Sequence, residues 1–93
     1  MNKKQLIELV ADDTGMSKAD AGRAVDAVFN RIGNALAAGN EATFVGFGTF
    51  KVVDVAERTG RNPQTGEVIV TPAKKKPKFV AGTALKEAVN RQS

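Results

Sequence analysis

The sequence of 93 residues contains no cysteine, no histidine, no tryptophan and no tyrosine. Without cysteine there is no disulfide framework and no thiolate nucleophile. Without histidine as well, the usual general base and the usual transition-metal ligands are both missing. A small hydrolase that works through carboxylates alone is an alternative, but no paired-acid motif supports it. We therefore expect no catalytic residues, no metal site and no cofactor.

The sequence also lacks a long apolar run. No stretch is long enough to span a bilayer, and the start Met1-Asn2-Lys3-Lys4 does not begin a signal-peptide pattern. The absence of cysteine fits a reducing compartment. We expect one domain over residues 1–93, near the small end of chains that fold alone, in the cytoplasm and with no membrane partner.

Acidic residues are scarce in the second half of the chain, so positive charge collects there. Residues 1–50 hold five Lys/Arg against six Asp/Glu, a net charge of −1. Residues 51–78 hold seven against three, a net charge of +4, and residues 79–93 hold two against one, a net charge of +1. A basic excess on one segment indicates a polyanionic partner.

That basic segment has the pattern of a β-ribbon. Residues 50–56 and 68–71 are rich in β-branched side chains, and the turn residues Asn62-Pro63 and Gly66 lie between them. We expect a ribbon that reverses at residues 63–66. Arg58 and Arg61 suit phosphates and the acceptors of base edges. A solvated hairpin tip with surface charges is the alternative.

Helices are expected on either side of this ribbon. Asn2 and Gln5 have the spacing of a capping box for a first helix, which Gly15 ends. Ser17 and Asp20 form a second capping box, and the helix that follows has an apolar face and stops at residues 39–40. The spacing also fits a helix-turn-helix, but the acidic second helix favours a hairpin that only packs.

The remaining elements make the predicted fold class α+β. We expect a short strand over 41–45, a turn over 46–50, a third strand that ends near residues 79–80, and a short C-terminal helix capped by Thr83. The prediction is therefore a helical hairpin, a three-stranded antiparallel sheet with a long β-ribbon arm, and a last helix. Pro72 and Pro77 flank the lysine run and are expected to limit ladder pairing.

All five aromatic residues are phenylalanines. Four of them fall in strands or turns at the base of the ribbon, and one falls in the second helix. Exposed rings on a sheet would stack on bases, but a chain with few other large apolar groups favours a core role. The predicted core residues are Phe29, Phe44, Phe47, Phe50 and Phe79.

These patterns together resemble a known family, the bacterial histone-like HU proteins and the related integration host factor. The resemblance covers nearly the whole chain. Its most specific parts are the stretch 45–50, the Gly-Arg-Asn-Pro-x-Thr-Gly sequence at 60–66, and the ending from Phe79 through Gly82 to Val89.

The resemblance implies an intertwined dimer whose arms enter the DNA minor groove. Residues 1–50 would then be mainly the dimerisation body, 51–78 the arm and its exit, and 79–93 the end of the last strand and the C-terminal helix. Pro63 would be a wedge between base pairs, although it could also be a turn former only. The phenylalanines would form the shared core. The implied DNA-binding residues are Arg58, Arg61, Asn62, Pro63, Lys74, Lys75, Lys76, Lys3 and Lys86.

The chain departs from the family pattern at three positions. Val53 and Val55 stand where many HU proteins have arginine, and Thr83 stands where lysine is common. In addition, Thr59 stands where integration host factor proteins commonly have proline. The resemblance thus implies a homodimer that bends and compacts double-stranded DNA with little sequence preference in the nucleoid. A sequence-preferring protein of the integration host factor type is the alternative, and RNA binding or a heterodimer with a paralogue is left open.

Overall fold

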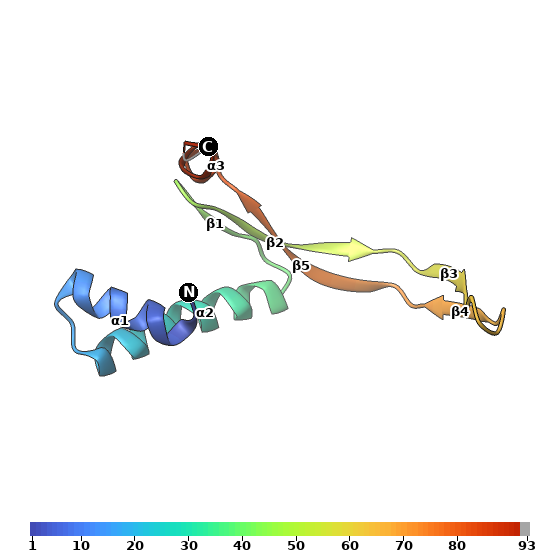
Figure 1. Ribbon diagram of the computed structural model, residues 1–93, viewed down its shortest axis with the longest axis horizontal. Helices are drawn as coiled ribbons and strands as arrows, with labels where there is room; N and C mark the ends of the chain where they lie inside the picture. Colours follow the sequence, from blue (N-terminus) through green and yellow to red (C-terminus); the bar gives the residue numbers. More distant parts are fainter. Residues whose placement is uncertain (92–93) are drawn as a thin grey trace. The chain divides into compact units, whose positions relative to one another are not determined.

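The computed structural model describes residues 1–91 and has the predicted α+β composition (Figure 1). The chain divides into two compact units: Met1–Ala35, here called the helical unit, and a sheet unit that begins at Leu36. The elements in order are α1 Lys3–Thr14, α2 Lys18–Ala37, β1 Ala42–Phe44, β2 Gly48–Val55, β3 Arg58–Arg61, β4 Val68–Thr71, β5 Lys74–Ala81 and α3 Thr83–Asn90.

Both predicted helix starts are confirmed. The Asn2 side chain accepts a hydrogen bond from the Gln5 backbone N–H at 2.9 Å, and the Gln5 side chain accepts one from the Asn2 N–H at 3.0 Å. Ser17 Oγ accepts from the Asp20 N–H at 3.1 Å at the start of α2. These bonds satisfy N–H groups that a helix leaves unpaired at its N-terminus. Gly15 ends α1 in the left-handed region, with φ of 75°.

The helical unit buries few side chains. Its buried apolar residues are Ala11, Ala21 and Val25, all of them small. Val28 and Phe29 are 54% and 49% exposed, and both belong to an open apolar groove of about 270 Å³. The residues that line this groove are Leu6, Val10, Ala24, Val25, Val28 and Phe29. One chain therefore leaves much of its helical apolar face in contact with water.

The sheet unit contains a three-stranded antiparallel sheet in the order β1-β2-β5. Phe50 of β2 lies directly opposite Phe79 of β5, and their ring centroids are 4.7 Å apart. Phe47 lies 5.4 Å from Phe79, and Phe44 lies 6.2 Å from Phe50. The predicted clustering is thus confirmed for four phenylalanines. Phe29 belongs to the helical unit, and the role of all five in a dimer core stays a prediction.

The turn into β2 is earlier than predicted. It occupies residues 45–47, and β2 begins at Gly48, which pairs with both Phe44 and Ala81. A Cβ atom on Gly48 would lie 2.6 Å from the Val80 carbonyl oxygen and 2.7 Å from the Phe79 ring. Only a residue without a side chain lets the strands and the ring approach this closely, which explains why this position of the ladder is a glycine.

The predicted continuous ribbon is interrupted. Residues 56–57 and 72–73 belong to neither ladder, so the β2–β5 pairing ends before a separate two-stranded β3–β4 ladder begins (Figure 1). Pro72 lies at this break, as its missing N–H predicts. Pro77, by contrast, lies within β5 opposite Val52, where an edge strand tolerates a proline.

The cap of the last helix also differs from the prediction. Gly82, not Thr83, is the N-cap of α3, and no side chain bonds there. Gly82 is fixed by the sheet, because its N–H donates to the Phe47 carbonyl oxygen at 2.8 Å. Its own carbonyl oxygen accepts from the Lys86 N–H at 3.0 Å and closes the first helical turn. Thr83 is therefore already helical.

The close approach at Gly48 leads to the first testable prediction. We expect Gly48→Ala to lower the free energy of unfolding by roughly 1–3 kcal/mol, because the added methyl group forces strand or ring to move. Denaturant unfolding at a fixed protein concentration measures this loss. Gly60→Ala is the matched control, since nothing lies within 4 Å of a Cβ at Gly60. Equal stability of the two variants would contradict the prediction.

The exposed apolar side chains lead to a second prediction. Phe47 and Phe79 are 48% and 39% exposed, in addition to Val28 and Phe29 in the helical unit. Because so little of this surface is covered within one chain, we expect it to be buried between two chains. The midpoint of thermal unfolding should then rise with protein concentration. A constant midpoint together with a monomer mass in sedimentation would show that one chain folds alone.

Candidate nucleic-acid interface

The tip of the arm is a turn held by its own backbone. The Asn62 N–H donates to the Glu67 carbonyl oxygen at 2.8 Å, and the Gly66 N–H donates to the Asn62 carbonyl oxygen at 2.7 Å. Gly66 has a φ of 72°, which glycine adopts without strain. The predicted reversal at residues 63–66 is confirmed, and it leaves Pro63 exposed.

Asn62 has a role in this turn that the sequence only suggested. Its Oδ1 accepts a hydrogen bond from the Gln64 N–H at 2.9 Å. In such an Asx turn the side chain bonds the backbone two residues later and so replaces a backbone turn bond, which is why Asn is favoured at this position. The carboxamide of Asn62 therefore links the two residues on either side of Pro63.

The two predicted arginines lie on opposite faces of the arm. Arg58 and Arg61 are the first and last residues of β3, and side chains alternate between the faces of a strand. Arg58 lies opposite Thr71 of β4, and Arg61 lies opposite Val68. A long contact of 3.5 Å joins the Arg61 guanidinium to the Gly66 carbonyl oxygen. All eight residues of β3 and β4 are exposed, so no core holds this ladder.

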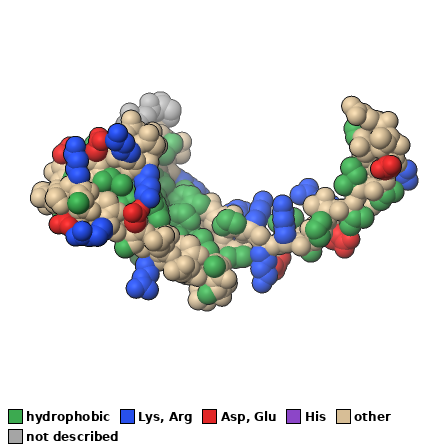
Figure 2. Space-filling view, turned by 90° about the horizontal axis from the view of Figure 1, so that it is seen from below, with side chains coloured by type: hydrophobic (Ala, Val, Ile, Leu, Met, Phe, Trp, Pro, Cys, Tyr) green, Lys and Arg blue, Asp and Glu red, His purple; other side chains and the backbone are tan. Residues whose placement is uncertain are grey.

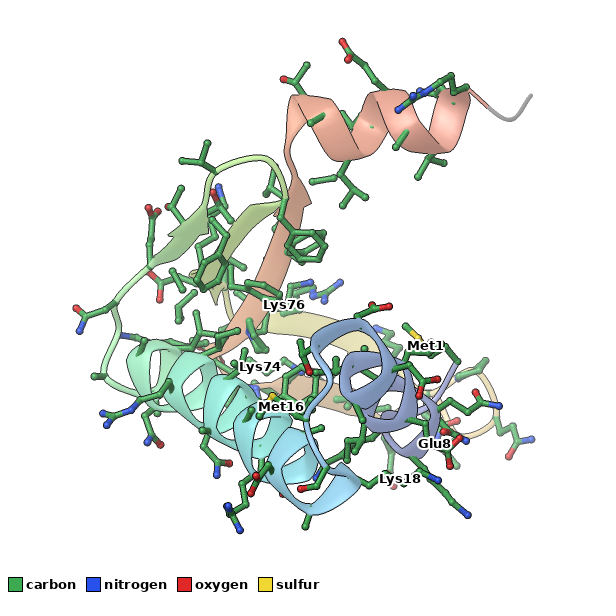
Figure 3. All side chains as sticks on the ribbon, turned by 90° about the vertical axis from the view of Figure 1, so that its left-hand side faces the viewer. Met1, Glu8, Met16, Lys18, Lys74 and Lys76 are labelled. Atoms are coloured by element: carbon green, nitrogen blue, oxygen red, sulfur yellow. The ribbon has the colours of Figure 1, made fainter. Side chains whose placement is uncertain are left out.

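The predicted lysine run lies in a paired strand, although Pro72 and Pro77 were expected to limit pairing there. Lys74, Lys75 and Lys76 are exposed residues of β5, opposite Val55, Asp54 and Val53 of β2. Figure 2 shows basic side chains projecting from the ribbon, and Figure 3 labels Lys74 and Lys76 on β5.

The other two predicted DNA-binding residues lie on helices. Lys3 belongs to α1 and forms an ion pair with Asp26 of α2. Lys86 belongs to α3 and is exposed. The predicted residues thus form two groups in the sheet unit: Arg58, Arg61, Asn62 and Pro63 on the arm, and the three lysines on β5. Lys3 lies in the helical unit.

Two further lysines lie on the β2–β5 ladder and were not among the predicted contacts. Lys51 and Lys78 are directly opposite each other. Successive side chains of a strand point to opposite faces, and Lys51 and Lys78 are the immediate neighbours of Phe50 and Phe79 in the sequence. Both lysines therefore lie on the face away from the rings. This assignment needs the register, which depends on which residues pair across the chain.

Over residues 1–91, no three His, Cys, Asp or Glu side chains come together as a metal site. In the same part of the chain, no helix combines the length and apolarity needed to cross a membrane.

Comparison with known proteins places these features in a family. The family model described as Bacterial DNA-binding protein matches residues 1–90. DNA-binding protein HU-beta of Pseudomonas fluorescens is 54% identical over 90 residues, which are 97% of this chain and 100% of that protein. DNA-binding protein HU of Geobacillus stearothermophilus is 54% identical over 89 residues, 96% of this chain and 99% of that protein.

Solved structures give the same result. A cocrystal structure of Anabaena HU with DNA has a TM-score of 0.89 at 37% identity, over 96% of this chain and 97% of that chain. HU from Thermotoga maritima has a TM-score of 0.69 at 37% identity, over 96% of this chain and 98% of that chain.

The geometry of the tip leads to a third prediction. In Gly66→Ala, an L side chain must occupy the left-handed region, at a cost of about 1 kcal/mol or more. We expect the Asn62 amide, which bonds across the turn, to exchange its hydrogen roughly fivefold faster. Amide exchange followed by NMR measures this rate, with Gly60→Ala as the control for a glycine on the same arm. Unchanged exchange would mean that Gly66 does not limit the turn.

Proposed function

Because this chain belongs to the family of bacterial DNA-binding proteins that includes HU, we propose that it is an architectural protein of double-stranded DNA. It bends and compacts DNA with little reading of sequence. The observation that carries this proposal is the arm: a fully exposed two-stranded ladder with arginine on both faces and a proline at its tip.

The unit that acts is a homodimer. The apolar groove of the helical unit and the half-exposed phenylalanines of the sheet unit need a partner surface. A second copy of the chain supplies one, and it doubles the number of arms. The Anabaena relative whose fold this chain matches was crystallised with DNA, which supports DNA as the ligand.

The arm enters the minor groove. This groove is only about 6 Å wide, so an inserted ribbon faces a wall on each side. Arg58 and Arg61 point to opposite faces and reach the two walls, while the Asn62 turn presents Pro63. An apolar wedge of this kind unstacks a base step and kinks the duplex; the HU relatives are among the standard examples. Lys74, Lys75, Lys76, Lys3 and Lys86 are the proposed phosphate contacts.

The same features argue against other functions. The family is one of DNA-binding proteins, and the chain has neither cysteine nor histidine for catalysis, so we propose no enzymatic activity. Thr59, where integration host factor proteins commonly have proline, favours weak sequence preference. The proposed location is the nucleoid, in the cytoplasm.

A salt series of duplex binding tests the proposed function. We expect affinity to fall steeply with salt, because binding releases counterions from the phosphates that the protein contacts. Random-sequence DNA should displace the protein roughly in proportion to competitor mass. A preferred site that survives excess random DNA would indicate a sequence-specific protein, and salt-independent binding would contradict the phosphate contacts.

The wedge role of Pro63 gives a separate prediction. We expect Pro63→Ala to leave the dimer and its thermal stability nearly unchanged, because the tip is exposed and outside any core. Bending should fall more than affinity for a long duplex, because alanine lacks the rigid ring that unstacks a base step. End-to-end energy transfer across a short duplex measures bending at equal occupancy. Bending equal to that of the parent would leave Pro63 as a turn former only.

A further inference from the structure

The register of the β2–β5 ladder assigns its side chains to two faces. The two strands pair antiparallel from Gly48 opposite Ala81 to Val55 opposite Lys74. Directly opposed side chains share a face, and successive residues alternate between faces. The ring contact between Phe50 and Phe79 identifies one face as aromatic. The same face continues outward with Val52 opposite Pro77 and then Asp54 opposite Lys75, as the register shows.

The opposite face holds nearly all the lysines. Its pairs are Thr49 with Val80, Lys51 with Lys78, Val53 with Lys76, and Val55 with Lys74. No acidic residue occurs on it, so these four lysines give a charge of +4. On the aromatic face Asp54 and Lys75 cancel to zero. The net charge of the whole ladder therefore lies on one face.

We propose that this lysine face, formed by Lys51, Lys74, Lys76 and Lys78, is the phosphate-contacting surface at the base of the arm. The assignment adds Lys51 and Lys78 to the DNA-binding residues and sets Lys75 apart, because an opposed carboxylate offsets its charge. It rests on the proposed function, which it makes specific to one face of one ladder.

The electrostatics of the free protein support this assignment. Lys51 and Lys78 are opposed like charges, an arrangement that destabilises a sheet. Lys74, Lys76 and Lys78 follow one another at about 6.6 Å along β5. Within residues 1–91 the ion pairs are Lys3–Asp26 and Arg23–Asp20, so no lysine of the ladder forms one. The register places a carboxylate, Asp54, opposite Lys75 and none opposite the lysines of the other face. A row of phosphates relieves this repulsion, and flexible ammonium groups bind phosphate without reading bases.

Exposed lysines on a strand also have a simpler explanation. Lysines on edge strands prevent sheets from pairing edge to edge, and β5 is an edge strand of its sheet. That explanation concerns aggregation and gives Lys75 the same role as Lys76. The proposal separates these two adjacent residues, so a comparison between them decides.

The experiment compares the salt dependence of binding to a random-sequence duplex between the parent dimer and five full-length variants. Two double variants, Lys51→Gln/Lys78→Gln and Lys74→Gln/Lys76→Gln, remove charge from the lysine face. Lys75→Gln removes one charge from the aromatic face, and Lys18→Gln is the control on α2. For the double variants we expect the slope of log K against log salt to fall by about 0.9 for every phosphate that the variant no longer neutralises.

Lys75→Gln is expected to lower the slope by less than half of the per-residue decrease in the double variants, and Lys18→Gln should match the parent. Lys51→Gln/Lys78→Gln should also unfold at the same or a higher temperature, because it removes a like-charge pair. A merely structural role would lower stability instead. Lys51→Arg/Lys78→Arg, which keeps both charges, should have the same slope of log K against log salt as the parent.

Two results would overturn the assignment. One is an unchanged slope in Lys51→Gln/Lys78→Gln, and the other is a decrease in Lys75→Gln as large as the per-residue decrease on the lysine face. In both cases the parent still binds duplex DNA in a salt-dependent way, so the proposed function stands. Failure of the proposed function is distinguishable, because the parent itself would then show no salt-dependent binding.

Discussion

The structure depends on the pairing of β2 with β5. This ladder places Phe50 opposite Phe79, and the contact between their rings fixes the register. The side-chain period of two then sends the alternate residues, including Lys51 and Lys78, to the other face. A slip of β5 by one residue would move Phe79 to the lysine face and Lys78 to the aromatic face. The packing that stabilises the sheet unit and the charge that we propose for DNA binding are therefore set by one register.

A second constraint is the shortage of core in a chain of this size. The buried apolar residues of the described part, Ala11, Ala21 and Val25, are small, and no large side chain is fully buried there. Burial between two copies supplies what one chain lacks. The β3–β4 ladder has no such compensation, because all its residues are exposed. A two-stranded ladder of this kind is marginally stable in water, so a bound ligand would supply most of its order.

Local features of the fold could be predicted from the sequence, while non-local pairing could not. The capping pairs Asn2–Gln5 and Ser17–Asp20 depend on residues three apart, so the sequence places them directly. The start of β2 at Gly48 depends on a ring and a carbonyl oxygen more than thirty residues away. The cap at Gly82 depends in the same way on Phe47. For the candidate site, residue types identified the arm, but only the register separates Lys75 from its neighbours.

The valines at 53 and 55 show why the register matters for comparing relatives. Read position by position, they suggest a weak grip on phosphate, since many HU proteins have arginine there. In the ladder, Lys76 lies opposite Val53 and Lys74 lies opposite Val55. Opposed Cβ atoms are only about 5 Å apart, so a cation on β5 serves the same face as one on β2. At these two pairs the charge of the face therefore comes from β5, because β2 carries valine at both positions.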